Sequence, residues 1–172
     1  TCRDHRGLAY EAACRSMVLL KNDRVALPLS LRLKRIAVVG PYAAEARTGG
    51  YSSTGTRVVT PLAGLRACFG RDRVVHARGC SLTGESRRGM AAAVKAARSA
   101  DAAVVVVGNW AGGSWKDNPH TEGEGRDRCD LRLPGVQEEL IRQVSAVNRR
   151  VIVVLVGGSA VTMEGWLDGV SA

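Results

Sequence analysis

Residues 102–107 read AAVVVV and are followed by Gly108. The run is continuously apolar and rich in β-branched valine, which is typical of a central strand in a parallel sheet with both faces covered. No apolar run in the chain is longer than six residues, whereas a helix that spans a bilayer needs roughly twenty. The stretch therefore predicts a buried parallel strand, and neither a transmembrane helix nor a membrane partner is expected.

Further strands and helices alternate on both sides of this run. The other expected strands are residues 35–39, a strand around Val74 and Val75 that ends at Gly79, and residues 151–156. The expected helices are residues 8–20 with Asp4 as a candidate N-cap, 61–69, 85–99 and 136–147. This alternation predicts an α/β fold, a three-layer sandwich with a mostly parallel sheet flanked by helices. Ligand sites of such folds lie at the carboxyl ends of the strands.

Composition and charge narrow the class of protein. The chain has 172 residues, 45% of them hydrophobic and 24% charged, which indicates one ordinary globular domain. Lys and Arg number 25 against 16 Asp and Glu, a net charge of +9. The arginines are scattered among acidic residues, and the few aromatic residues form no pattern of base-stacking platforms. We therefore expect a solvated basic surface and no nucleic-acid partner.

The five cysteines have no CxxC spacing, so a zinc knuckle or a thioredoxin-type motif is not expected. Cys14 lies in an apolar helical pattern and Cys68 lies beside Phe69, which predicts that both are buried as small hydrophobic residues. The glycine-rich residues 49–53 have no Lys-Ser/Thr pair after them, and no GxGxxG fingerprint is present. Neither a nucleotide, nor a metal, nor any other cofactor is predicted.

The densest polar cluster is HTEGEGRDR at residues 120–128, directly downstream of the central strand. Acidic residues interleaved with glycines on a strand-end loop can bring a carboxyl group close to a substrate oxygen, because glycine lets the backbone approach. The alternative is that Asp127 and Arg128 pair with neighbours and that the glutamates are solvated. Composition alone favours this second interpretation.

The string Glu124-Gly125-Arg126-Asp127-Arg128, followed by LPG at residues 133–135, resembles the carboxyl-terminal α/β domain of glycoside hydrolase family 3, which includes β-glucosidases and β-xylosidases. Other pieces resemble that domain in the same order. They are VLLKN at 18–22, LPL at 27–29, IAVVGP at 36–41, GGYS at 49–52, VTPL at 59–62 and GC at 79–80. The resemblance covers nearly the whole chain.

The resemblance implies a retaining enzyme that removes β-linked glucosyl or xylosyl units from the nonreducing end. Its nucleophile would be an aspartate of a preceding barrel domain, which is absent from this sequence, so the chain alone is expected to be inactive. The general acid/base of the family maps onto Glu124, with Glu122 as the runner-up. A noncatalytic module that binds carbohydrate or a partner chain through the same loop is the alternative.

Other residues of the loop are weaker candidates. Trp110 and Trp115 can stack on a sugar ring or fill the contact with the missing barrel. His120 can hydrogen-bond a sugar hydroxyl, although a lone histidine after an Asn-Pro turn is more often structural. Arg128 is expected to turn away from Glu124 and to pair with Asp127, so that these two residues serve as the scaffold of the loop.

The sequence also suggests domain boundaries. Residues 1–30 are interpreted as a lead-in helix and linker, and residues 31–172 as the α/β domain, incomplete because family members continue after Ala172. The chain begins without methionine and without the apolar stretch of a secretory signal, so a piece of a longer protein is favoured and the compartment stays open.

Overall fold

The computed structural model describes the whole chain except residues 1, 50, 53–57, 112–120, 124 and 126. A four-stranded sheet forms its centre, with the strand order β2-β1-β3-β4 and parallel pairing throughout. The strands are β1 (Ile36–Val39), β2 (Val74–Ala77), β3 (Ala102–Gly108) and β4 (Val151–Val156). The predicted parallel sheet is confirmed, and residues 102–107 form its long central strand.

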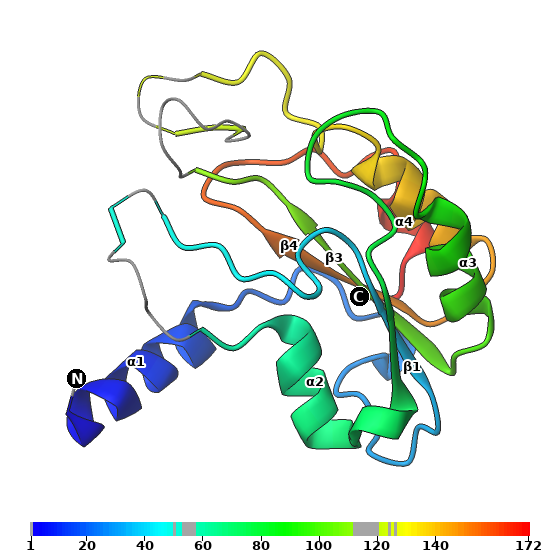
Figure 1. Cartoon of the computed structure of the whole chain (residues 1–172), viewed down its shortest axis with the longest axis horizontal. Helices are drawn as coiled ribbons and strands as arrows, with labels where there is room; N and C mark the ends of the chain where they lie inside the picture. Colours follow the sequence, from blue (N-terminus) through cyan, green and yellow to red (C-terminus); the bar gives the residue numbers. More distant parts are fainter. Residues whose placement is uncertain (1, 50, 53–57, 112–120, 124, 126) are drawn as a thin grey trace.

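Helices cover both faces of this sheet (Figure 1). The α-helices are α1 (Arg3–Ser16), α2 (Pro61–Phe69), α3 (Met90–Arg98) and α4 (Gln137–Ser145). The short 3-10 helices are η1 (Asp23–Val25), η2 (Arg71–Arg73) and η3 (Leu167–Gly169). Leu62 and Phe69 of α2 pack on one face, and α3 and α4 pack together on the other face. The three-layer sandwich is therefore confirmed.

The central strand divides its side chains between two hydrophobic cores. All seven residues of β3 are buried. Val104 and Val106 belong to the core beneath α2, whereas Val105 and Val107 belong to the core beneath α3 and α4. This division follows from the alternation of side chains along a strand, and it explains why a strand covered on both faces is continuously apolar.

The helix boundaries differ from the predicted ones where long-range contacts intervene. Helix α2 has the expected bounds, because Pro61 occupies its first turn and the Thr60 side chain accepts a hydrogen bond from Ala63 N at 3.1 Å. Helix α3 begins at Met90 rather than near residue 85, and Arg87 instead pairs with Glu139 of α4. The capping motif was local and visible in the sequence, whereas the contact between α4 and Arg87 was not.

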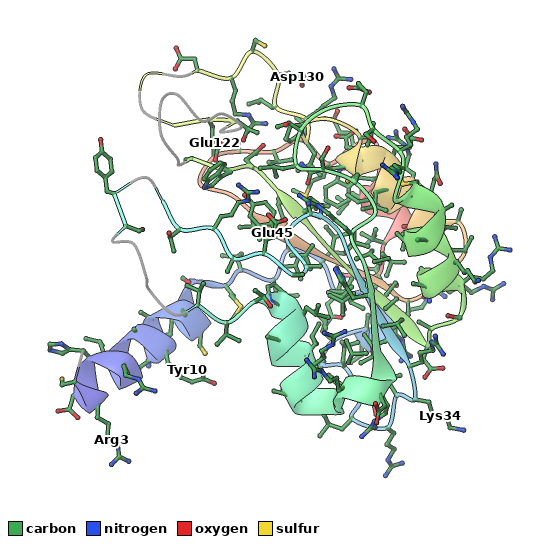
Figure 2. The ribbon with its side chains drawn as sticks, viewed as in Figure 1. Arg3, Tyr10, Lys34, Glu45, Glu122 and Asp130 are labelled. Carbon is green, nitrogen blue, oxygen red and sulfur yellow. The ribbon has the colours of Figure 1, made fainter. Side chains whose placement is uncertain are left out.

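Helix α1 begins and ends earlier than the pattern of residues 8–20 predicts, and it carries no buried residue. Its N-cap is Cys2 rather than Asp4, which lies in the first turn. Residues 17–20, which read MVLL, lie beyond the helix and are 62–78% exposed. Figure 2 shows Arg3 and Tyr10 on this helix, away from the sheet. The apolar residues whose spacing predicted the helix therefore do not pack into a core within the described residues.

Two glycines let β1 and β3 leave the sheet at their carboxyl ends. Gly40 has a φ of 108°, and a Cβ atom there would lie 2.1 Å from Val106 O. Gly108 has a φ of 155°, and a Cβ atom there would lie 1.8 Å from Val156 O. Only glycine allows such close approach of one backbone to another.

The side chain of Gln137, at the start of α4, holds the carboxyl end of β3. It is fully buried, and its Oε1 accepts a hydrogen bond from Gly108 N at 2.9 Å. Its Nε2 donates to the carbonyl oxygens of Gly108 and Leu82, both at 2.9 Å. The buried amide thus satisfies both backbone groups of Gly108 and fixes the point from which the next loop departs.

The cysteines are distributed differently from the prediction. Cys14 and Cys68 are exposed, as are Cys2 and Cys129, and only Cys80 is buried. The prediction for Cys14 and Cys68 was wrong because α1 has no buried face and because Cys68 lies on the outward side of α2. Within the described ranges, no helix has the length and apolar character that a membrane span requires.

We predict that Gln137→Leu destabilises the chain by about 3 kcal/mol, because leucine fills a similar volume but leaves the buried N–H and C=O of Gly108 without partners. Urea unfolding followed by circular dichroism measures the change. Gln143→Leu is the matched control, since Gln143 is exposed on the same helix and bonds Glu139 one turn away, and a change within about 0.5 kcal/mol is expected there. Equal effects of the two variants would contradict the assignment.

We also predict that Cys80 resists alkylation. Burial raises the pKa of the Cys80 thiol to about 11, so little thiolate is present at neutral pH. Iodoacetamide at pH 7.5, followed by peptide mass analysis, should label the other four cysteines first. Labelling of Cys80 at the same rate as Cys129 in folded protein would show that this part of the core is open.

Candidate active site

The loops that follow β1, β3 and β4 meet at one edge of the sheet. These strands are neighbours in the sheet and parallel, so their carboxyl ends lie side by side. Figure 2 shows Glu45, from the loop after β1, and Glu122, from the loop after β3, toward this edge. This is the edge where the fold class places ligand sites.

The loop after β1 is bound to the start of the loop after β3. Tyr42 is buried, and its hydroxyl donates to Asn109 O at 2.6 Å. Burial raises the pKa of Tyr42 to about 12, with the charge of Arg47 acting in the opposite direction. The phenol is therefore neutral at physiological pH and available as a donor. Sequence reasoning missed Tyr42, because nothing local distinguishes it from the loop around it.

Trp110 forms the second contact between these loops. Its Nε1 donates to Thr48 O at 3.3 Å, and the Arg47 guanidinium carbon lies 4.4 Å from the centre of its ring. Arg47 is held in turn by Glu45, with 2.8 Å between Nη2 and Oε2. These contacts cover one face of the indole and fix it to the neighbouring loop. They favour a role for Trp110 in holding the two loops together. Its stacking on a sugar ring stays a prediction.

Trp110 and Thr121, which flank the segment 111–120, are hydrogen-bonded to each other. Thr121 N donates to Trp110 O at 2.8 Å, and Trp110 N donates to the Thr121 hydroxyl at 2.9 Å. Two candidates of the sequence analysis, Trp115 and His120, lie outside the described residues. The loop therefore returns to the edge of the sheet at Thr121, immediately before the acidic string.

Glu122 is buried, with 6% of its surface exposed. Both of its carboxylate oxygens accept hydrogen bonds from the chain. Its Oε1 accepts a hydrogen bond from Gly158 N at 3.2 Å, and its Oε2 accepts one from the Ser159 hydroxyl. Arg128 Nη1 lies 3.5 Å from the same Oε2. The carboxylate thus receives donors from two loops, which is how a buried charge is tolerated.

Arg128 joins the same group of residues from the other side. Its Nη1 donates to the Ser159 hydroxyl at 2.8 Å and to Ala160 O at 2.7 Å, and its Nη2 donates to Arg132 O at 3.0 Å. The side chain is only 9% exposed. We refer to Glu122, Arg128 and Ser159 together as the clamp. Sequence reasoning missed Ser159, for which the GGS string at residues 157–159 after β4 was the available signal.

The expected partner of Arg128 is corrected by the structure. Within the described part of the chain, Arg128 pairs with Glu122 rather than with Asp127. Asp127 is exposed and lines a cavity of about 560 Å³ together with Asn109 and Thr121. Arg128 instead reaches the loop after β4, where the Ser159 hydroxyl and Ala160 O also accept its hydrogen bonds.

Glu124 itself lies outside the described residues, but the residues around it in sequence are described. Gly123 and Gly125 are exposed and have φ values of 132° and 69°. Both are backbone conformations that favour glycine. The five residues between Glu122 and Arg128 are therefore attached to the clamp at both ends.

Chemically, the described residues offer hydrogen-bond donors, acceptors and an anchored acidic loop. Among them no group of three His, Cys, Asp or Glu side chains could hold a metal ion. A parallel α/β sandwich with an acidic loop fixed at the carboxyl edge is the class of domain that these observations define.

Comparison with known proteins identifies the family. The profile of the glycosyl hydrolase family 3 C-terminal domain matches residues 17–172, and this chain belongs to that family. The match begins inside the expected lead-in segment, so the boundary at residue 30 stays a prediction.

The relatives are longer proteins. A β-xylosidase of Formosa agariphila is 36% identical over 190 residues, which cover 98% of this chain and 25% of that protein. A solved exo-β-xylosidase, XlnD, in complex with a xylobiose aziridine probe has a TM-score of 0.81 at 35% identity over 96% of this chain and 20% of its own. A β-glucosidase of Bifidobacterium adolescentis has a TM-score of 0.81 at 35% identity over 98% of this chain and 24% of its own. The chain thus spans a fifth to a quarter of their length.

We predict that Arg128→Met lowers the free energy of unfolding by about 3 kcal/mol, because it leaves the buried Glu122 carboxylate without its cation. Chemical denaturation of the chain measures this loss. Arg132→Met removes a cation from a pair with Asp130 in which the arginine side chain is 70% exposed, and it should leave the free energy of unfolding close to that of wild type. Similar losses in both variants would argue against a special role of the buried pair.

Proposed function

We propose that this chain is the carboxyl-terminal domain of a retaining, exo-acting β-glycosidase of the β-xylosidase or β-glucosidase type, and that Glu124 is its general acid/base. The observation that carries the proposal is the attachment of the five-residue span around Glu124 to the clamp at the carboxyl edge of the sheet. Membership of the family and the enzymes named among the relatives support the reaction class.

The proposed reaction has two steps. In the first, the Glu124 carboxyl group gives its proton to the glycosidic oxygen as the bond from C1 to that oxygen breaks, and an aspartate oxygen forms a bond to C1. In the second, the Glu124 carboxylate takes a proton from water, and the water oxygen replaces the aspartate on C1. Such a retaining mechanism requires carboxyl groups about 5 to 5.5 Å apart.

The runner-up, Glu122, suits this role poorly. A general acid/base must exchange its proton with substrate and with water. The Glu122 carboxylate is buried, and both of its oxygens already accept hydrogen bonds from the chain. Protonation would also remove its ion pair with Arg128. Glu124 lies between two exposed glycines in the sequence, and the proposal therefore keeps it as the acid/base.

The nucleophile is proposed to come from a barrel domain of the same enzyme. The coverage of the relatives supports a longer protein, because this chain matches only a fifth to a quarter of their length. Residues 17–20, four exposed apolar residues in a row, provide surface of the kind that a second domain covers. The chain on its own is therefore proposed to be inactive.

We predict that Glu124→Gln in the full-length enzyme lowers kcat/KM for an alkyl β-xyloside or β-glucoside by about 10² to 10⁴-fold, because proton transfer to the leaving oxygen is lost. A 2,4-dinitrophenyl glycoside needs no such proton and should lose much less in the first step. The basic limb of the pH profile should disappear, and added azide should raise turnover and yield a glycosyl azide.

Asp130→Asn is the matched control, since it removes one negative charge from the same loop at an exposed pair. It should keep wild-type rates and the wild-type pH profile. Unchanged hydrolysis of the alkyl glycoside by Glu124→Gln, with the basic limb intact, would remove Glu124 from the mechanism.

A further inference from the structure

We infer that the clamp of Glu122, Arg128 and Ser159 is the positioning device of the catalytic loop: it anchors the two ends of the span between Glu122 and Arg128 to the loop after β4. This inference rests on the proposed function, and it assigns Glu122 a positioning role in place of proton transfer. It also assigns a role to the GGS string after β4.

The clamp buries two opposite charges on a loop. The Glu122 and Arg128 side chains are 7% and 9% exposed. Burying an ion pair gains little stability over well-packed apolar residues, because removing both charges from water offsets their attraction. A pair that contributes little net stability but holds both partners in one geometry serves to fix position.

The clamp also joins separate segments of the chain. Glu122 binds Gly158 N and the Ser159 hydroxyl of the loop after β4. Arg128 binds the same hydroxyl at 2.8 Å and also Ala160 O at 2.7 Å. The Ser159 hydroxyl therefore donates to the glutamate and accepts from the arginine, so one side chain connects both ends of the span to one place on the neighbouring loop.

The span between Glu122 and Arg128 contains two described glycines. Gly123 and Gly125 have positive φ values, so the turn between the two anchors uses backbone conformations that other residues rarely adopt. The clamp therefore acts on the placement of this span through its two described ends, Glu122 and Arg128. Catalysis is sensitive to such placement, because an error of about 1 Å can cost on the order of 10²-fold in rate.

The decisive variant is Glu122→Gln in the full-length enzyme. Glutamine has the shape of glutamate and can still accept from Gly158 N, but the buried guanidinium of Arg128 loses its ion partner. For an alkyl glycoside, we expect kcat to fall by about 10 to 10²-fold with a smaller change in KM. The pH profile should keep its basic limb, and azide should produce no glycosyl azide, because the acid/base at Glu124 is still present.

Two further variants remove only part of the clamp and should lower kcat by smaller amounts. Arg128→Lys keeps a charge beside Glu122 but cannot make the same set of hydrogen bonds, so its kcat should lie between those of wild type and Arg128→Met. Ser159→Ala keeps the ion pair and removes only the bridging hydroxyl. It tests the clamp even if Glu122→Gln fails to fold, with an expected fall in kcat of about 3 to 10-fold. Asp130→Asn again serves as the charge control and should match wild type.

Two results would overturn the inference. One is azide rescue of Glu122→Gln together with loss of the basic limb, which would make Glu122 the proton donor. The other is wild-type kcat in folded Ser159→Ala or folded Glu122→Gln. Failure of the proposed function is recognised separately, because it depends on the azide and pH behaviour of Glu124→Gln alone.

Discussion

The buried ion pair between Glu122 and Arg128 is the interaction on which the arrangement of loops at the carboxyl edge of the sheet depends. Its two residues are six apart in sequence and enclose the glycine-rich span that contains Glu124. Through Ser159 and Gly158 the same pair reaches the loop after β4. A surface loop is thereby joined to a neighbouring strand end by charged groups that little water reaches, where such interactions are stronger than on an exposed surface.

The rest of the fold provides a rigid base for this pair. The sheet is parallel, so β1, β3 and β4 present their carboxyl ends together. Gln137 fixes the end of β3, and Tyr42 binds Asn109 from the loop after β1. Sites that are supported by buried side chains and regular elements hold catalytic groups more accurately than free loops do. In the proposed enzyme, the barrel domain provides the nucleophile, and this domain provides the acid/base on a supported loop.

The sequence predicted what local patterns determine. The apolar run of β3 and the Thr60-Pro61 start of α2 were sufficient to place those elements. The sequence did not predict that Arg128 forms its ion pair with Glu122 rather than with the adjacent Asp127. Nor did it predict that Cys14 and Cys68 are exposed. These outcomes depend on which segments meet in three dimensions. Glu124 was selected by resemblance, and its role stays a prediction.

The most direct test of this account is the crystal structure of the full-length enzyme with a bound substrate analogue. The measured quantity is the separation between the Glu124 carboxyl group and the nucleophilic aspartate of the barrel, on opposite sides of the glycosidic bond. We predict about 5 to 5.5 Å, with Glu122 and Arg128 still paired behind the loop. A structure in which Glu122 occupies that place, with Glu124 turned away from the sugar, would contradict the account.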